Sequence, residues 1–205
     1  MKLKVFLAGA LLVAYSTVAV AQHDHGAPAK GNTPPPMDPA MMEAMMKAGM
    51  PGDAQKKLEA FAGTWTTEIK MWMAPGTDPM ASTGVSENKM TMGGRYLEQR
   101  FKGEFFGAPF EGIGYTGYDN VKKQYWGTWM DSMSTASMNS TGSLSADGKT
   151  YTFKATMADP MTGKDATSDE KITIVDADHH TMEMWGPGMD GKVYKMMEIS
   201  YTRKK

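Results

Sequence analysis

The chain has 205 residues, with 22 Lys and Arg against 23 Asp and Glu, 4 His, 22 Met and no Cys. This length fits one domain with a tail, or two small domains, and the net charge of −1 excludes the broad basic surface that nonspecific nucleic-acid binding requires. Without Cys the chain can form no disulfide, Cys-ligated zinc site or Fe–S cluster.

The first 21 residues have the pattern of a signal peptide. Lys2 and Lys4 precede the apolar run 5–20, and Ala19-Val20-Ala21 is the small-x-small pattern of a cleavage site. The alternative is a retained membrane anchor, but the run of 16 residues is shorter than a span, which needs about 20. We therefore expect cleavage before Gln22, no membrane span afterwards, and a periplasmic or secreted protein.

Two segments precede the main domain. Residues 22–36 are rich in Pro, Gly and Ala without apolar periodicity, which predicts a flexible tether. Residues 37–62 form a short Met-rich helical segment, in which Asp38 is the expected N-cap and Pro39 the first helical residue. We expect the break at 49–52 to separate a second short helix. The Met residues that share one face of the first helix are Met41, Met42, Met45 and Met46.

The pattern changes to a period of two from Gly63 to the end of the chain. In the first segment Trp65, Thr67 and Ile69 alternate with polar residues, as on a half-buried strand. Turn signals such as Pro75-Gly76 separate the segments that follow. These are 83–92, 95–105, 109–118, 123–131, 135–144, 150–157, 166–175, 180–185 and 192–203.

About ten strands with short connections and no helical crossovers predict an all-β domain over 63–205. Such a meander is antiparallel and up-and-down, because consecutive strands joined by short loops pair with each other. Its two edge strands must be hidden, and closure into a β-barrel does this directly. A two-sheet sandwich is the alternative.

The apolar composition of the chain after residue 21 is unusual. It contains 4 Val, 5 Ile and 3 Leu, against 21 Met and 18 aromatic residues. Met is flexible and polarizable, whereas branched side chains define a packed core more sharply. For any single Met we favour simple core filling. For the set as a whole, core filling and the lining of an adaptable apolar cavity stand as equal interpretations.

Two further patterns require interpretation. Gly112–Gly117 matches G-x-G-x-x-G, but it leads into a turn and another strand instead of a helix, so we reject dinucleotide binding and expect glycines that leave room inside a barrel. His179 and His180 open a strand, where alternation places them on opposite faces. We expect them in a surface turn, and we predict no cofactor.

The N-terminal segments carry an alternative metal hypothesis. His23 and His25 flank Asp24, a pattern that suits Cu(II) or Zn(II), and the thioethers of Met41, Met42, Met45 and Met46 suit Cu(I). The competing interpretation, which we favour, is a solvated tether followed by a helix that lays its Met face on the domain.

Carboxylates among the strand patterns carry a second alternative, an enzyme. Asp131 with Glu98 or Glu111 could act as acid and base if they met in a pocket. Charged side chains on strands face solvent by default, and the chain shows no positioned nucleophile. We therefore assign no catalytic residues.

A short helix runs into Gly63-Thr64-Trp65 at the start of the first strand, and Arg203 follows the last strand. In these features the chain resembles the calycin superfamily of lipocalin-like barrels. In calycins such a Trp and Arg stack across the closed base, so the resemblance implies a Trp65–Arg203 contact. The chain differs from lipocalins in its ten expected strands and lack of a Cys pair, and from haem-binding nitrobindin-like barrels in lacking an evident interior His.

Further stretches of the chain carry a more specific resemblance. They are Met92–Leu97, Phe110–Gly112, Gly117–Asn120, Thr128–Ser134, Asp159–Gly163, Met197-Glu198 and Tyr201–Arg203. In these stretches the chain is similar, over about residues 37–203, to a bacterial family of exported calycin-like proteins defined only as a domain of unknown function. This resemblance implies the barrel fold and supplies no catalytic residues.

These observations together predict a non-enzymatic exported barrel that binds a small apolar or amphipathic molecule. The matched stretches and the neighbouring strands supply the candidate binding residues. These are Arg95, Tyr115, Trp126, Trp129 and Met130.

Overall fold

The computed structural model describes residues 37–188 and 190–205, so the predicted signal peptide and tether, with His23 and His25, lie outside the described residues. The helical segment consists of α1 (Pro39–Gly49), α2 (Asp53–Lys56) and the 3₁₀-helix η1 (Lys57–Phe61). Asp38 caps α1 as expected, because its side chain accepts a hydrogen bond from the Ala40 amide at 2.8 Å. None of these helices is long and apolar enough to cross a membrane.

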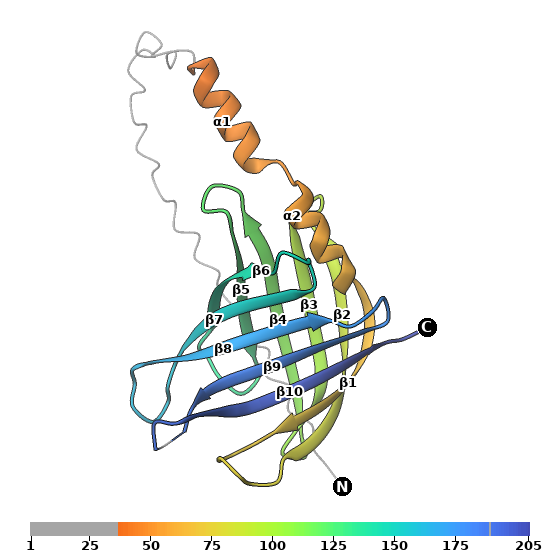
Figure 1. Ribbon diagram of the computed structural model, residues 1–205, viewed down its shortest axis with the longest axis vertical. Coiled ribbons are helices and arrows are strands. Elements are labelled where there is room, and N and C mark those ends of the chain that lie inside the picture. The colour runs from red at the N-terminus through yellow and green to blue at the C-terminus, as the bar shows by residue number, and fades with distance from the viewer. Residues whose placement is uncertain (1–36, 189) are drawn as a thin grey trace, which may run out of the picture. The chain divides into compact units, whose positions relative to one another are not determined.

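Ten strands follow, and each pairs antiparallel with the next until β10 pairs with β1 (Figure 1). The predicted up-and-down barrel is therefore confirmed, and the sandwich alternative is wrong. The strands are β1 (Gly63–Met71), β2 (Met80–Thr91), β3 (Tyr96–Phe105), β4 (Ala108–Asp119), β5 (Gln124–Asp131), β6 (Met138–Leu144), β7 (Thr150–Ala158), β8 (Asp165–Ile174), β9 (His179–Pro187) and β10 (Val193–Arg203).

The register of the strands keeps one set of side chains inside the barrel. On β1, Trp65 and Thr67 alternate with exposed positions, and Thr67 lies opposite Tyr201 of β10. The same parity continues to Glu170 of β8, which lies opposite Phe153 of β7 and Met184 of β9. Side chains of one parity on every strand therefore face a common interior.

The base of the barrel is closed by η1 and Arg203. Leu58 and Phe61 of η1 are buried and pack in a cluster with Tyr125 and Tyr151. The Arg203 guanidinium carbon lies 4.0 Å from the centroid of the Trp65 ring, which confirms the contact that the calycin resemblance implies. Arg203 also donates to the carbonyls of Ala60, Ala62 and Ala177, so the last strand is fastened to η1.

Polar contacts fix the helical segment to the turns at the same end. The Gln55 amide donates to the Tyr118 carbonyl at 3.1 Å, and the Asn120 amide donates to the carbonyls of Ala48 and Met50. Arg95 donates to the Gly49 carbonyl at 3.0 Å. The opposite end carries the β1–β2, β3–β4, β5–β6, β7–β8 and β9–β10 turns, and no described helix covers it.

Candidate functional site: the barrel cavity

The barrel encloses a cavity of about 400 Å³ that extends from η1 toward the opposite end. Its wall is mainly apolar and combines aromatic rings with flexible thioethers. Met side chains therefore do line a cavity, which was one of the two interpretations of the Met-rich composition. The Met residues in the wall are Met71, Met133, Met138, Met157, Met182, Met184 and Met197.

Glycines on β4 make room for the largest ring in the wall. A Cβ on Gly114 would lie 2.9 Å from the Trp129 indole, and one on Gly112 would overlap that ring. The Trp129 indole nitrogen donates to the Asp131 carboxylate at 3.0 Å, which holds the ring over the two glycines. Two of the three glycines of the G-x-G-x-x-G match, Gly112 and Gly114, thus leave room inside the barrel as expected, whereas Gly117 lies against Trp126.

A hydrogen-bonded chain of polar side chains lies on the inner face of β2 and β3. The Gln99 amide donates to the Ser86 hydroxyl at 2.9 Å, and Ser86 donates to Asn88 at 2.8 Å. Asn88 in turn donates to the Phe61 carbonyl at 3.0 Å, which also accepts from the Trp65 indole at 2.8 Å. This wall of the barrel, which we call the β2–β3 wall, satisfies its buried polar groups internally.

Other buried polar atoms have no hydrogen-bond partner among the described residues. They include Glu170 Oε1 on β8, His180 Nδ1 on β9 and Thr67 Oγ1 on β1. Glu170 and His180 line the cavity, and only 7% and 5% of their surfaces are exposed. A buried polar group without a partner costs free energy, so this β8–β9 wall contains groups that a bound molecule could satisfy.

His180 lies inside the barrel, and the expectation of a surface turn for it is wrong. Its ring stacks on Tyr201 with the centroids 4.2 Å apart and meets the Trp65 ring edge-on. Burial, with the positive charge of Arg203 nearby, lowers the pKa of His180 to about 3. Its neighbour His179 is exposed and contacts Asp176 at 2.8 Å, so the prediction of opposite faces is confirmed.

Burial also governs the ionisation of Glu170. Desolvation alone raises the pKa of its carboxyl from 4.5 to about 7. Desolvation likewise raises the pKa of the Tyr201 phenol to about 12, and the nearby Glu170 adds to this rise. At neutral pH the interior thus holds a neutral imidazole, a neutral phenol and a carboxyl whose pKa lies near the ambient pH.

Of the candidate binding residues, Trp129 lines the cavity. Tyr115 also forms part of the wall, but its hydroxyl donates to Glu98 at 3.1 Å, and Glu98 lines a separate pocket with Arg100 and Lys89. The other three candidates, Arg95, Trp126 and Met130, are absent from the cavity wall. Arg95 holds α1, and Trp126 and Met130 have the opposite parity to Trp129 on β5.

The three carboxylates of the enzyme alternative do not meet in one cavity. Asp131 lines the barrel cavity, where it accepts from Trp129 and from the Met133 amide. Glu98 pairs with Arg100 at 2.7 Å, and this hydrogen bond lowers its pKa. Glu111 is exposed and lies 3.2 Å from Lys102. No three His, Asp or Glu side chains of residues 37–188 and 190–205 group as metal ligands.

Sequence reasoning missed Glu170 and His180, although a usable signal existed. Glu170 has the parity of Ile172 and Ile174 on its strand, and His180 has the parity of Met182 and Met184. Apolar neighbours at i+2 and i+4 indicate the inner face. The rule that charged residues face solvent concealed Glu170, and the expectation of a surface turn concealed His180.

Comparison with known proteins places the fold and leaves the ligand open. Among solved structures, Rv2717c from M. tuberculosis has a TM-score of 0.58 and 14% identity, covering 75% of this chain and 99% of that one. A de novo designed fluorescence-activating β-barrel has a TM-score of 0.41 and 17% identity, with coverage of 75% and 100%. A redesigned β-barrel has a TM-score of 0.40 and 14% identity, with coverage of 73% and 96%.

A search of the curated proteins finds no match. The family model described as a protein of unknown function, DUF1579, matches residues 50–203, which include every strand of the barrel. The chain therefore belongs to the DUF1579 family.

Proposed function

We propose that the protein is a binding protein that holds a small amphipathic molecule in the barrel cavity. The observation that carries this proposal is the combination of a cavity of about 400 Å³ with unpartnered polar groups in its wall. A small-molecule site commonly joins apolar walls to a few polar groups that orient the ligand. An empty barrel that served only as a scaffold would gain stability from filling this space.

The composition of the wall supports an adaptable ligand site. Met182, Met184 and Met197 lie on adjacent strands, where their thioethers can change rotamer around ligands of different shape. At the base, Leu58 and Phe61 close the cavity. A ligand would enter from the opposite end, which no described helix covers.

Displacement of a neutral fluorescent probe tests the proposal. We expect N-phenyl-1-naphthylamine to bind the full protein with increased fluorescence and 1:1 stoichiometry. Ser82 lines the cavity, so Ser82→Phe would place a ring in the ligand's space and weaken binding at least tenfold. The matched control is Thr83→Phe, because Thr83 is exposed on the same strand. Equal binding by both variants, or no binding by the wild type, would contradict the proposal.

We also propose that the protein acts in the periplasm or outside the cell, since residues 1–21 have the pattern of a signal peptide. N-terminal sequencing of protein from separated cell fractions tests this, with Gln22 expected as the first residue of the exported form. An uncleaved chain in the cytoplasmic fraction would contradict it.

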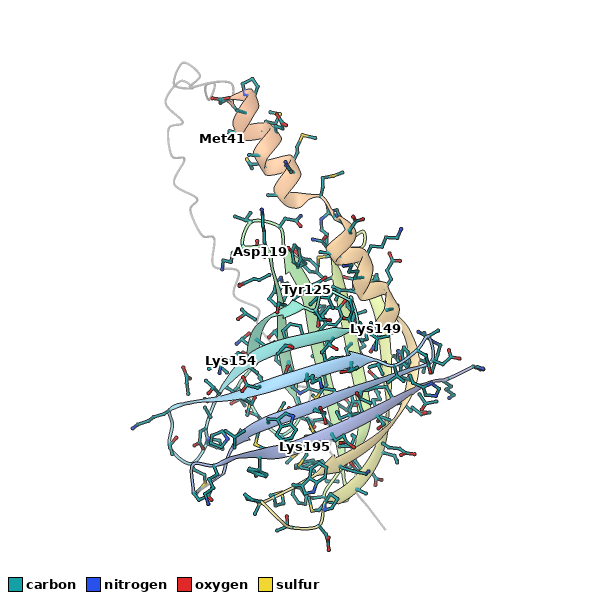
Figure 2. The ribbon with its side chains drawn as sticks, in the orientation of Figure 1. Met41, Asp119, Tyr125, Lys149, Lys154 and Lys195 are labelled. Carbon is teal, nitrogen blue, oxygen red and sulfur yellow. The ribbon has the colours of Figure 1, made fainter. Side chains whose placement is uncertain are left out.

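A second candidate function is copper binding by α1, favoured by the exposure of its Met face. No residue of α1 is buried, and Figure 2 shows Met41 on the helix with no strand packed against it. The competing packing interpretation required that face to lie on the domain. We expect replacement of Met41, Met42, Met45 and Met46 by Leu to lower Cu(I) affinity at least tenfold under chelator competition, without changing Tm. Unchanged affinity would remove this candidate.

A further inference from the structure

The charged residues that line the described part of the cavity wall are all of one sign. Among the described residues that line it, Glu104, Asp131 and Glu170 carry carboxyl groups, and none is Lys or Arg. Glu104 is exposed at the end of β3, and Asp131 lies at the end of β5. Glu170 alone is deeply buried, between Phe153 and Met184 in the register.

Among the described residues, Glu170 has no partner for its charge. No described Lys or Arg forms a salt bridge with it, and its Oε1 atom makes no hydrogen bond. Exposed carboxylates of the same barrel do have cations, as Asp169 has Lys154 at 3.3 Å. An ionised carboxylate without a counterion in a low-dielectric interior is strongly disfavoured.

We propose that the ligand is an organic monocation with an apolar body, such as a lipophilic amine or quaternary ammonium compound, and that Glu170 is its counterion. This inference rests on the proposed binding function and specifies the ligand's charge. A cation supplies the missing partner of Glu170, and aromatic rings and thioethers in the wall interact favourably with cations and their alkyl groups. An anionic ligand would add a second negative charge where no positive group faces it.

A metal ion is a poorer occupant than an organic cation. No three His, Asp or Glu side chains of the described segments group as metal ligands. Divalent ions require several oxygen or nitrogen ligands, whereas an organic cation needs one counterion and an apolar enclosure. The Met and aromatic wall around Glu170 supplies that enclosure.

Protonation of Glu170 lets the empty site exist without a buried charge. Burial raises the pKa of Glu170 to about 7, so a cation would bind with release of a proton at neutral pH and below. The other titratable groups that line the cavity are Tyr115 on β4, Tyr151 on β7, His180 on β9 and Tyr201 on β10, with Asp131 and Glu104 at the strand ends. The phenols and the imidazole stay neutral between pH 5 and 8.

Three decyl compounds that differ only in head group test the charge preference. Decyltrimethylammonium, decanol and decanoate would each compete with N-phenyl-1-naphthylamine for the full protein at pH 8. We expect decyltrimethylammonium to bind at least tenfold more tightly than decanol, and decanoate to bind weakest. The affinity for decyltrimethylammonium should fall up to about a hundredfold from pH 8 to pH 5, because the ionised fraction of a carboxyl with a pKa of about 7 changes by that factor.

Two variants assign the preference to one carboxyl. Glu170→Gln keeps the shape of the side chain and should abolish both the preference and the pH dependence. The matched control Asp169→Asn removes an equal charge from the outer face of β8 and should leave both unchanged. Equal affinity for the three compounds, a preference for decanoate, or a cation preference that survives in Glu170→Gln would overturn the inference while the binding function stands. Failure of the neutral probe to bind at all would instead overturn the proposed function.

Discussion

Two walls of the same barrel differ in whether their buried polar groups have hydrogen-bond partners. On the β2–β3 wall, Gln99, Ser86 and Asn88 form a chain of hydrogen bonds that ends at the Phe61 carbonyl. On the β8–β9 wall, Glu170 and His180 are as deeply buried but have unpartnered atoms. The first arrangement stabilises the closed base, and the second costs stability unless another molecule supplies partners. The difference separates the part of the interior that holds the fold from the part that is available for binding.

The largest effect is expected at the closed base. Trp65 is almost fully buried, donates to the Phe61 carbonyl and stacks with Arg203. Trp65→Ala should lower the free energy of unfolding by about 3–5 kcal/mol, the usual cost of removing a buried large aromatic side chain. Urea denaturation measures this. Trp185→Ala, at an exposed ring, should lower the free energy of unfolding much less. An equal loss at both positions would show that the closed base does not stabilise the fold more than other parts of the barrel.

On the β8–β9 wall, Glu170→Gln should change the free energy of unfolding in the opposite direction to Trp65→Ala. The folded-state pKa of Glu170, about 7, lies above its ordinary value of 4.5, so the folded state binds its proton more tightly. The stability that this proton provides is present below pH 4.5 and is lost as pH rises through 7. The free energy of unfolding of Glu170→Gln, relative to that of wild type, should therefore rise by about 3 kcal/mol between pH 4 and pH 8.

His180 contributes a pH dependence of the other sign in both proteins. Its folded-state pKa of about 3 lies below 6.5, so its stability contribution is present above pH 6.5 and is lost as pH falls toward 3. Because His180 is the same in both proteins, its contribution cancels in the difference between their free energies of unfolding. Chemical denaturation at pH 4, 6 and 8 measures the difference, and a difference that does not change with pH would show that Glu170 is not desolvated.

A smaller loss is expected when the satisfied wall is broken. Asn88→Ala removes the group that joins Ser86 to the Phe61 carbonyl. Because Ser86 stays buried and loses its acceptor, the free energy of unfolding should fall by about 1–3 kcal/mol, independently of pH. Thermal and urea unfolding check this value. A neutral effect would mean that the two walls do not differ energetically, despite their different geometry.

The sequence predicted the barrel well because alternation and turn signals are local. The spacing of Trp65, Thr67 and Ile69 predicted both the first strand and its inner face, and the Arg203 contact was implied by the calycin resemblance. The site was predicted poorly because motif matches do not report strand parity. The matched stretch and its strand suggest Trp126 and Met130 together with Trp129, yet residues an odd number of positions apart on a strand face opposite sides.

The unpartnered groups could not be predicted, because pairing depends on the whole barrel. The His180 ring contacts Phe61 and Tyr201, which lie at opposite ends of the domain's sequence. Whether Glu170 finds a cation is decided by side chains on other strands of the barrel. Parity places both residues inside, but only the closed structure shows that Glu170 Oε1 and His180 Nδ1 have no hydrogen-bond partner among the described residues.

The smallest effect on stability is expected from the thioethers of the β8–β9 wall. Met182 and Met184 line the cavity on β9, and replacement of both by Leu nearly conserves volume, so the expected loss is below about 1.5 kcal/mol per site. Leu has fewer rotatable bonds than Met, so the wall should adapt less well to ligands of different shape. In a competition assay, the ratio of the affinities for straight-chain and branched decyl ammonium compounds should therefore be larger in the variant than in wild type. An unchanged ratio would assign these two Met residues to core filling, and the cavity's shape would then be set by Trp129 and the other aromatic rings.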